Sequence, residues 1–302
     1  MSEGPEVAAA LAELEARLAA LVARLDGVAT KVDEIRQLVG PFGVRLGARR
    51  LLVQSIHGQK YLVEPDDLII TPQLVVYRQW EADVSAFVSR TLGPDSVFVD
   101  VGANFGYFTC LAASRIGRGG KGRVVAVEPS PAMLALLEAN ITINWSMADI
   151  EVARLAAGRE AGRAWLSIPR HRAANASLAA KPDGGEGFDQ VEVEVASLDA
   201  LLAPGEAAHV LKIDVEGHET DVLCGARRLI GGSPDILVVM EWSLSQMREA
   251  GFDPGSLLGL IAELGLSPYA LCGDGSVGSP LGADQLRQLG YATVVLRRAS
   301  PA

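Results

Sequence analysis

A short apolar run that ends in a glycine-rich turn is the feature that most constrains the fold of this chain. Residues 97–106 read VFVDVGANFG, and helical spacing follows over Tyr107–Ile116. Gly102 and Gly106 allow the backbone to turn tightly and to approach a ligand without a Cβ in the way. The segment therefore predicts a buried strand that is joined to a helix by a tight turn, as in nucleotide-binding α/β folds.

Strand-like and helix-like segments alternate through the rest of the chain. Further strands are expected over Val124–Glu128, Ile150–Leu155, Val191–Val195, Val210–Asp214 and Ile236–Glu241, and a closing pair over Tyr269–Cys272 and Ala292–Arg297. Helices are expected over Pro131–Asn140, Thr220–Ile230 and Leu257–Leu264. Repeated β-α units of this kind predict an α/β fold with a doubly wound, Rossmann-like parallel sheet, which we place over residues 96–302.

The section that precedes this domain, residues 41–95, has mixed content. Arg50–Ile56 and Lys60–Val63 flank a short turn and predict a hairpin, and Asp83–Leu92 has helical spacing. We expect a small α+β cap section packed against the catalytic domain. Trp80 and Glu81 lie just ahead of its helix and are candidates to close over a cofactor or substrate.

Residues 1–40 predict a coiled-coil helix. Apolar residues alternate at spacings of four and three, at Val7, Leu11, Leu14, Leu18, Leu21, Leu25, Val28, Val32, Ile35 and Val39. That regular seam favours self-association over a helix packed on its own domain, so we expect a homo-oligomer formed through residues 7–39. The flanking positions do not pair opposite charges in a parallel dimer, so the number of helices stays open.

Composition narrows the partners and the compartment. The net charge of −10 argues against a nucleic-acid backbone as the main partner. No apolar run reaches the roughly 18–20 residues that span a bilayer, and Glu13, Glu15 and Arg17 interrupt the N-terminal apolar stretch that a signal peptide would need. The cysteines are odd in number and widely spaced, at Cys110, Cys224 and Cys272. Free thiols and a cytoplasmic location are expected.

An acidic residue follows the glycine-rich turn at the spacing of a ribose ligand. Glu128 ends the next strand, 22 residues after Gly106, where a carboxylate accepts hydrogen bonds from ribose hydroxyls. A dinucleotide would favour Gly-x-Gly-x-x-Gly and gains nothing from a carboxylate such as Asp100 beside its pyrophosphate. A ligand with an ammonium group and a sulfonium centre does gain from it. The pattern therefore favours S-adenosylmethionine over NAD.

Four separated motifs resemble one methyltransferase family. Asp100–Thr109, Glu128-Pro129, Asn175–Leu178 and Leu211–Glu219 occur in the order seen in the FkbM family, and the resemblance covers roughly Val75 to Glu241. It implies a class I methyltransferase fold and usually O-methylation of a hydroxyl on a sugar, glycan or natural product. The acceptor would then be a small molecule or a glycan. The expected cofactor contacts are Glu81, Asp100, Gly102, Asn104, Phe105, Gly106, Glu128, Pro129, Ser130 and Asp214.

Methylation of a hydroxyl also needs a route for its proton, through a base or a metal that acidifies it. His218 is the natural general base, and Asp214 and Glu241 end neighbouring strands where such folds place their ligands. Asp214, Glu216 and Glu241 also form a candidate oxygen-ligand site for Mg²⁺. Candidate substrate-lining residues are Trp80, Asn175, Ser177, Glu216 and Trp242.

Three other functions stay open at this point. N-methylation would depend less on a general base, because an uncharged amine is already nucleophilic. An NAD-dependent oxidoreductase is disfavoured by Asp100 and Asn104. A non-catalytic oligomerising scaffold that retains a cofactor-binding fold would account for the N-terminal heptads. Binding measurements with S-adenosylmethionine and NAD separate the oxidoreductase from the methyltransferases.

Overall fold

The computed structural model describes residues 4–38, 43–117, 119–145, 148–169, 176–179 and 188–299. The chain divides into two compact units, Met1–Phe42 and Gly43–Ala302. Residues 41–95 were expected as a small cap section packed against the catalytic domain, and residues 43–95 lie in the same compact unit as residues 96–302. Asn175, predicted to line the substrate site, lies outside the described residues.

The first unit is a single long helix. Helix α1 spans Gly4–Leu38, close to the extent of the heptad pattern. Its heptad side chains between Leu11 and Val32 are 41% to 66% exposed, so they form an apolar stripe along one side of the helix. The expected helix is confirmed, while its self-association stays a prediction.

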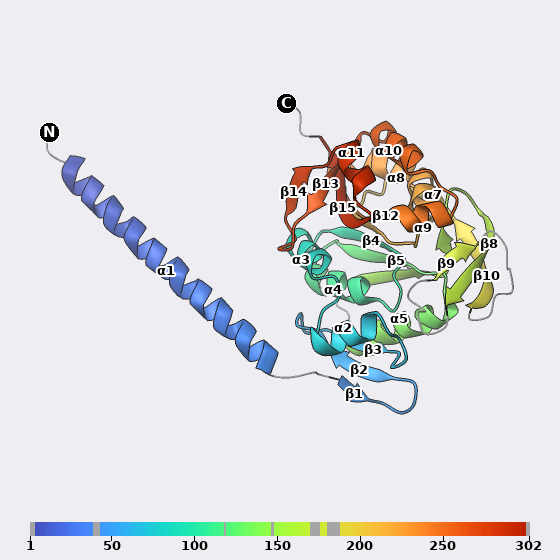
Figure 1. Ribbon diagram of the computed structural model, residues 1–302, viewed down its shortest axis with the longest axis horizontal. Coiled ribbons are helices and arrows are strands. Elements are labelled where there is room, and N and C mark those ends of the chain that lie inside the picture. Colours follow the sequence, from blue (N-terminus) through green and yellow to red (C-terminus); the bar gives the residue numbers. More distant parts are fainter. Residues whose placement is uncertain are drawn as a thin grey trace. The chain divides into compact units, whose positions relative to one another are not determined.

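The second unit is built on an eight-stranded sheet with the order β14-β13-β15-β12-β11-β4-β5-β6 (Figure 1). The strands β6, β5, β4, β11 and β12 are parallel, and β15, β13 and β14 pair antiparallel at one end. Their bounds are β4 Val97–Val101, β5 Arg123–Val127, β6 Asp149–Ala153, β11 Val210–Ile213, β12 Leu237–Ser243, β13 Leu266–Leu271, β14 Val277–Pro280 and β15 Tyr291–Arg298. The predicted doubly wound, mostly parallel sheet is confirmed.

Helices cover both faces of this sheet, which explains why the central strands are continuous apolar runs. On β4, Phe98 packs into one core with α3 and α4, while Val99 and Val101 face the core formed with α7, α8 and α10. The helices are α3 Ala82–Thr91, α4 Tyr107–Ile116, α5 Pro131–Asn144, α6 Leu198–Leu201, α7 Glu219–Cys224, α8 Arg227–Gly232, α9 Leu244–Glu249, α10 Pro254–Glu263 and α11 Ala283–Gln288. None of the described helices has the length and apolar character that crossing a bilayer requires.

The single helix predicted over Thr220–Ile230 is wrong, because the structure divides it into α7 and α8. The carbonyl of Gly225 accepts the N–H of Asp199 instead of continuing the helix. The Asp199 carboxylate then accepts the N–H groups of Arg228 and Leu229 at 2.7 and 2.9 Å, and so caps the start of α8. The break comes from a residue remote in sequence.

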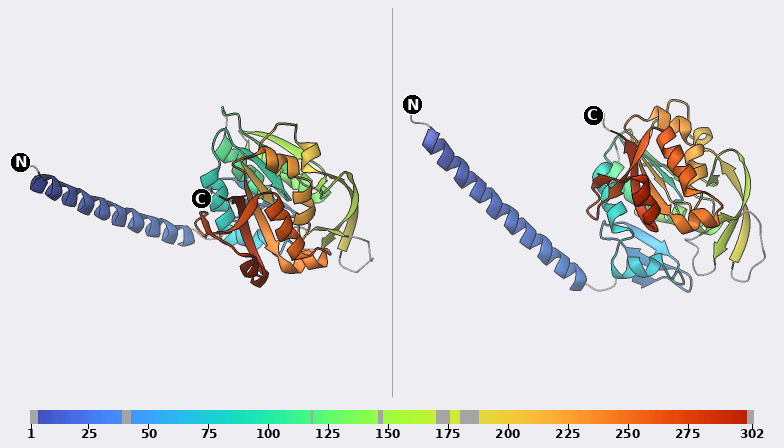
Figure 2. Two further views of the ribbon diagram at one scale, coloured as in Figure 1. Left: turned by 90° about the horizontal axis from the view of Figure 1, so that it is seen from above. Right: turned by 45° about the horizontal axis from the view of Figure 1, so that its top comes forward.

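A second sheet of four strands, order β7-β10-β8-β9, follows β6 in the chain. Its strands are β7 Ala156–Ala157, β8 Gly162–Pro169, β9 Ser177–Ala179 and β10 Phe188–Ala196. Only part of β10 was expected from the sequence. In all three ribbon views this sheet lies to one side of the main sheet (Figures 1 and 2).

Residues 43–76 add a small antiparallel sheet and one helix to this unit: β1 Gly43–Arg45, β2 Leu51–Gln54, β3 Lys60–Val63 and α2 Ile70–Val76. The expected hairpin is β2-β3. The Tyr61 hydroxyl donates to the carbonyl of Tyr107 at 3.0 Å, and Asn140 exchanges two hydrogen bonds with the backbone of Leu62. These bonds fix the hairpin to α4 and α5, next to the glycine-rich turn.

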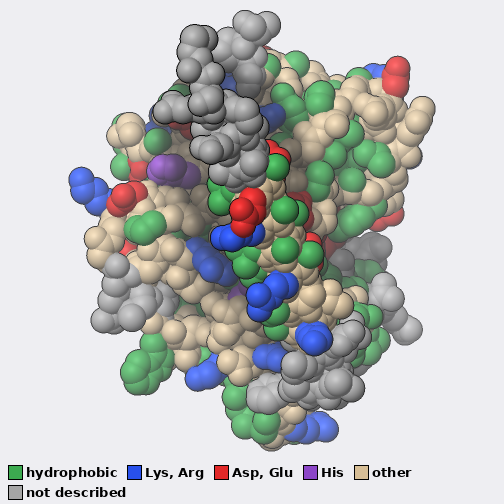
Figure 3. Space-filling view, turned by 90° about the vertical axis from the view of Figure 1, so that its left-hand side faces the viewer, with side chains coloured by type: hydrophobic (Ala, Val, Ile, Leu, Met, Phe, Trp, Pro, Cys, Tyr) green, Lys and Arg blue, Asp and Glu red, His purple; other side chains and the backbone are tan. Residues whose placement is uncertain are grey.

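The surface shows charged residues of both signs, and the cysteines are free thiols as the sequence predicted. Charged side chains of both signs are interspersed with apolar ones on the face drawn in Figure 3. All three cysteines carry free thiols, and Cys110 is buried.

Candidate functional site

The glycine-rich turn at the end of β4 is held by contacts within the protein. Gly102, Asn104 and Gly106 all have positive φ, at 76°, 55° and 90°. A Cβ on Gly102 would lie 1.9 Å from the carbonyl oxygen of Asp214, and one on Gly106 would lie 2.5 Å from Leu137 Cδ1. The glycines are therefore needed for the close approach of other parts of this chain, and their role in the approach of a ligand stays a prediction.

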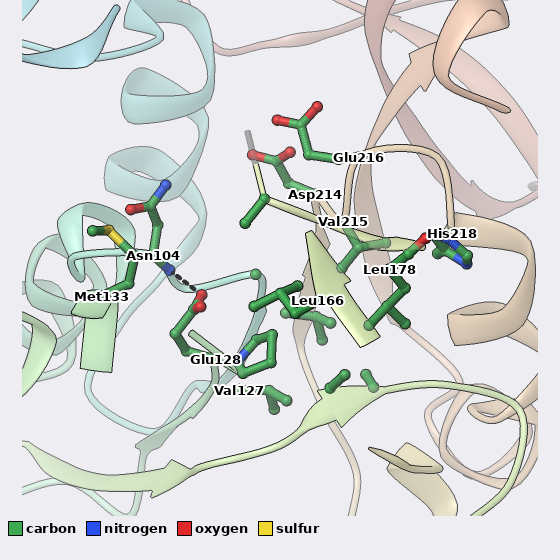
Figure 4. A pocket seen from close by; sticks show the side chains of 16 residues that line it. Asn104, Val127, Glu128, Met133, Leu166, Leu178, Asp214, Val215, Glu216 and His218 are labelled. Atoms are coloured by element: carbon green, nitrogen blue, oxygen red, sulfur yellow. Dashed lines mark hydrogen bonds between the residues drawn. The ribbon is translucent and has the colours of Figure 1, made fainter. Parts of the chain in front are cut away.

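Glu128 fastens this turn to the end of the neighbouring strand. Its Oε2 accepts the backbone N–H of Asn104 at 2.8 Å, and its Oε1 accepts that of Ser130 at 2.7 Å (Figure 4). Burial raises the pKa of Glu128 to about 7, although both backbone donors oppose that shift. A carboxylate offers about four acceptor positions, so roughly two remain for ligand hydroxyls.

A pocket opens beside Glu128, and we call it the Glu128 pocket. Its walls are largely apolar and include Val127, Pro129, Met133, Ala157, Leu166 and Leu178. Figure 4 shows Asn104 and Glu128 on one side and His218 on the other, with Leu166 between them. The pocket lies where the strand order reverses between β4 and β11, the usual place for ligands in open α/β sheets.

A second space, the acidic chamber, lies on the other side of the same turn. It encloses about 180 Å³ and is defined by the carboxyl groups of Glu81, Asp214, Glu216 and Glu241 together with the Lys212 ammonium. Trp80, Phe105, Tyr107, Phe108, Gln246 and Tyr291 complete its wall. Gly102, Asn104, Asp214 and Glu216 line both spaces, which therefore form one site with two halves.

Lys212 supplies the positive charge in the chamber wall. Its side chain is nearly fully buried, with Nζ 3.1 Å from Asp214 Oδ2 and 5.0 Å from the centre of the Phe108 ring. Burial lowers the pKa of Lys212, but the carboxylates of Asp214, Asp100 and Glu81 outweigh it and raise that pKa above its ordinary value. Lys212 therefore stays charged and forms an ion pair with Asp214.

Two carboxyl groups of the chamber hold protons more tightly than usual. Burial and then the Asp214 charge raise the pKa of Glu81 to about 8, while Lys212 opposes the shift. Burial and then the charges of Asp214, Glu216 and Glu219 raise the pKa of Glu241 to about 9. Tyr291 hydrogen-bonds the Glu241 carboxyl, yet Glu241 Oε2 is buried and has no hydrogen-bond partner among the described residues.

The backbone is strained around this chamber. Glu81, Asn104 and Glu216 have φ values of 40°, 55° and 55°, in the left-handed region that non-glycine residues rarely adopt. Each such residue costs on the order of 1–3 kcal/mol and persists only when its surroundings enforce it. Strain of this kind often accompanies functional sites, and here three such residues line one chamber.

Asp100, predicted to contact the cofactor, lies beneath the site. It is fully buried, its Oδ2 accepts the Thr109 hydroxyl at 2.6 Å, and it lines neither half of the site. Its charge reaches the chamber through Lys212. Asp100 was predicted to contact the cofactor directly. Its position indicates instead that it supports the site from beneath.

His218 lies in the other half of the site from Glu241. Its Nε2 is 2.8 Å from the carbonyl oxygen of Leu178, and its ring packs edge-on against Phe252. Because a carbonyl only accepts, Nε2 carries the hydrogen and only Nδ1 is left to take a proton. His218 lines the Glu128 pocket and not the acidic chamber.

The remaining predicted residues divide between the site and the core. Glu81, Phe105, Pro129, Trp80 and Glu216 line one half of the site or both. Gly106 and Ser130 lie behind it, where the Ser130 hydroxyl caps α5. Trp242 is fully buried and its indole N–H donates to the carbonyl of Leu286 at 3.0 Å. The prediction that Trp242 lines the substrate site is wrong, because alternation along β12 turns its side chain into the core.

An open groove of about 1060 Å³ continues from the site along the second sheet. It shares Glu216 and Gln246 with the acidic chamber and His218 with the Glu128 pocket. Ser177, predicted to line the substrate site, lines this groove together with Trp165, whose side chain is partly exposed. The groove and the chamber are continuous through Glu216 and Gln246.

The structure gives no support to the magnesium hypothesis. Among the residues that it describes, no three His, Cys, Asp or Glu side chains are grouped so that they could hold a metal ion. Asp214, Glu216 and Glu241 line one chamber, but their charges face a lysine and one another.

Lys212, Gln246 and Tyr291 are site residues that sequence reasoning missed. Lys212 had a visible signal, since it is a lone charged residue inside a buried strand, where burial demands a partner. Gln246 and Tyr291 carry no comparable signal, because only the fold brings α9 and β15 to the chamber.

The strand order, in which β15 runs antiparallel between β12 and β13 at one end of a parallel sheet, is that of the class I methyltransferases. Residues 100–267 match the family described as the methyltransferase FkbM domain. The chain therefore belongs to the FkbM family of methyltransferases.

Similar proteins include one curated relative and several solved structures. The relative is the hexuronic acid methyltransferase AglP of Haloferax volcanii, 29% identical over 190 residues that make up 62% of this chain and 70% of AglP. An S-adenosylmethionine-dependent O-methyltransferase from Thermotoga maritima is 15% identical with a TM-score of 0.39, covering 83% of this chain and 78% of that one. A precorrin-6y C5,15-methyltransferase from Geobacter metallireducens is 14% identical with a TM-score of 0.40, covering 72% and 87%. The structural similarities are low, so the fold assignment rests on strand order and on the family.

Proposed function

We propose that this protein transfers a methyl group from S-adenosylmethionine to a hydroxyl group of a saccharide. The observation that carries the proposal is the site with two halves that meet at the glycine-rich turn, Gly102 to Asn104. One half offers apolar walls and a carboxylate at Glu128, and the other is acidic. S-adenosylmethionine has matching ends, an adenosine with ribose hydroxyls and a chain that carries two positive charges.

The residues present fit this cofactor better than NAD. Glu128 retains acceptor positions for ribose hydroxyls, and Val127, Leu166 and Met133 provide an apolar wall for the adenine ring. Asp214 and Glu216 lie at the junction of the two halves, where an ammonium group gains from them. A pyrophosphate at that place would face carboxylates, which repel it.

S-adenosylmethionine supplies an electrophilic methyl group when bound, and the protein must supply position and a route for the proton. Glu241 is the proton acceptor that the geometry favours, because Oε2 is buried and free of hydrogen bonds within the described structure. The electrons of the hydroxyl O–H bond would stay with the oxygen as it bonds to the methyl carbon, the electron pair of the broken methyl–sulfur bond would return to sulfur, and the proton would pass to the ionised form of Glu241. His218, with Nε2 engaged by Leu178, is placed to close the adenosine side instead.

The acidic chamber also bears on the choice between a hydroxyl and an amine acceptor. Carboxylates near an amine favour its protonated form, which is not nucleophilic. The charges of Asp214 and Glu216 would therefore work against N-methylation. Support for a saccharide comes from AglP, which is described as a hexuronic acid methyltransferase, and from the groove beside Trp165.

Two experiments test this function. Calorimetry should show binding of S-adenosylmethionine and S-adenosylhomocysteine and none of NAD. Mass spectrometry of reactions with a panel of sugars, uronic acids and oligosaccharides should then reveal a methylated saccharide. Binding of NAD without S-adenosylmethionine would overturn the assignment of the cofactor, and methylation of amines alone would overturn the hydroxyl acceptor.

A further inference from the structure

We propose that the groove along the second sheet binds the sugar units adjoining the methylated one, so that the acceptor is an oligosaccharide and Trp165 contributes to its recognition. The inference rests on the proposed function and adds to it the class of acceptor. The groove is continuous with the acidic chamber through Glu216 and Gln246, and with the Glu128 pocket through His218.

Strand β8 contributes to the site and to the groove with side chains that point in opposite directions. Side chains alternate along a strand, so Leu166 lies on one face of the second sheet, and Trp165 and Ser167 lie on the other. Leu166 is buried in the small core of this sheet and lines the Glu128 pocket (Figure 4). Trp165 and Ser167 line the groove. A ligand in the groove would therefore contact the same strand that closes the pocket.

Two exposed aromatic side chains line the groove. Trp165 is 41% exposed and Phe188 is 49% exposed. Phe188 pairs with Pro169, which lies four residues beyond Trp165 on β8, so the two aromatic residues share a face and are about 13 Å apart along the strand at 3.3 Å per residue. The C–H faces of pyranose rings pack on exposed aromatic rings, and one pyranose ring is shorter than this distance. The two side chains would therefore contact different units of one chain.

Helices of the main sheet add hydrogen-bonding groups to the groove. Asp221 lies on α7, and Gln246 and Glu249 lie on α9. Arg159, which also lines the groove, pairs with Asp221 at 3.1 Å. Saccharide hydroxyls both donate and accept hydrogen bonds, so carboxylate, amide and guanidinium groups all suit them. The combination of aromatic and polar groups fits a chain whose rings have apolar faces and hydroxylated edges.

Gln246 lies where the groove meets the acidic chamber, and one of its atoms has an unmet hydrogen bond. It lines both spaces, and its Nε2 donates to Glu216. Its Oε1 is buried and accepts no hydrogen bond within the part of the chain that the structure describes. Such an acceptor is costly to leave without a donor. A hydroxyl of a saccharide that extends from the chamber into the groove would supply that donor.

The test measures binding of the full-length protein, in the presence of S-adenosylhomocysteine, to immobilised glycans that range from monosaccharides to hexasaccharides. We expect binding to at least one series of oligosaccharides, and weaker binding to the matching monosaccharide. Trp165→Ala should weaken that binding about tenfold, which corresponds to about 1.4 kcal/mol. Trp165→Phe should restore most of it, because an aromatic ring remains. Phe188→Ala should weaken the binding of longer members alone, and calorimetry should give all variants the same affinity for S-adenosylmethionine.

Trp145 offers a matched control. It is 83% exposed at the end of α5 and lines neither half of the site nor the groove, so Trp145→Ala should leave glycan binding unchanged. Absence of any bound glycan, equal binding of monosaccharides and oligosaccharides, or an equal loss in Trp145→Ala would overturn the inference. Methylation of a monosaccharide would still support the proposed function in those cases. Failure of the parent protein to bind S-adenosylmethionine would overturn the proposed function itself.

Discussion

Glu128 accepts the backbone N–H of Asn104 at 2.8 Å and so joins the ends of two adjacent parallel strands, β4 and β5, on one side of the site. The same carboxyl group accepts the N–H of Ser130, at the start of α5. An acidic residue at this position is usually considered only as a ligand for ribose. Here it also holds the glycine-rich turn that both halves of the site share, so we expect ligand binding and local stability both to depend on this side chain.

Replacing Glu128 with alanine should therefore affect both properties. Loss of charge-assisted hydrogen bonds to ribose should weaken S-adenosylmethionine binding by about 1.5–3 kcal/mol. The N–H groups of Asn104 and Ser130 lose their acceptor, so the free energy of unfolding should fall by about 1–3 kcal/mol. Calorimetry and denaturant unfolding measure the two effects. Unchanged affinity in a folded Glu128→Ala protein would exclude Glu128 as the ribose ligand, and Glu263→Ala is the control.

Much of the fold around this turn follows from local sequence. The apolar run of β4 and the helical period of α4 predicted Val97–Val101 and Tyr107–Ile116 with the bounds that the structure has. Both elements are buried, and the glycine-rich turn between them marks where the strand ends and the helix begins. β8 was missed because polar residues such as Arg163 and Ser167 interrupt its pattern, as expected for a sheet with one exposed face.

Only those site residues that lie at the carboxyl ends of strands could be predicted from the sequence. Glu128, Asp214 and Glu241 each lie at the carboxyl end of a strand, and the structure brings all three to the site. Tyr291 and Gln246 reach the chamber only through the packing of the C-terminal elements, which no local pattern encodes. Trp242, in contrast, was wrongly predicted to line the site. Side chains alternate along β12, so Glu241 faces the chamber and Trp242, the next residue, faces the core.

The N-terminal helix should drive self-association and be dispensable for cofactor binding. Its apolar seam, which includes Leu18 and Leu25, is exposed in the helix and repeats every heptad. Light scattering should give an oligomer for the full chain and a monomer for residues 43–302, with the same affinity for S-adenosylmethionine. Leu18→Glu with Leu25→Glu should have the same effect as truncation, and Arg17→Glu with Arg24→Glu is the control at flanking positions. Equal monomeric masses of the full and shortened chains would contradict the prediction.

The stability of the ligand-free protein should fall as the pH rises from about 4.5 to about 9. Glu81, Glu128 and Glu241 have folded-state pKa values raised above the ordinary value of 4.5, to about 8, about 7 and about 9. Between those values the folded state binds more protons than the unfolded state, so raising the pH favours unfolding.

Thermal melts between pH 5 and pH 9.5 measure this dependence. Glu241→Gln carries no titrating group at that position, so its melting temperature should decline less steeply than that of the parent. S-adenosylmethionine, whose positive charge stabilises the ionised carboxylates, should flatten the decline as well. The prediction fails when parent and Glu241→Gln lose stability in parallel over this range.

The last prediction separates Glu241 from His218 in turnover. Once an acceptor is identified, Glu241→Gln should lower kcat by about 10²–10⁴-fold, the range for loss of a general base. His218→Ala should have a smaller effect on kcat and should mainly weaken cofactor binding, because His218 lines the Glu128 pocket while its Nε2 is held by Leu178.

Chelation with EDTA should leave activity unchanged, since proton transfer to a carboxylate needs no metal. A base also affects the pH profile of the rate, and the loss of rate as the pH falls below about 9 should disappear in Glu241→Gln. An inactive His218→Ala enzyme with an active Glu241→Gln enzyme would assign the base to His218 through Nδ1, and restoration of EDTA-treated enzyme by Mg²⁺ would assign the acidification of the hydroxyl to a metal.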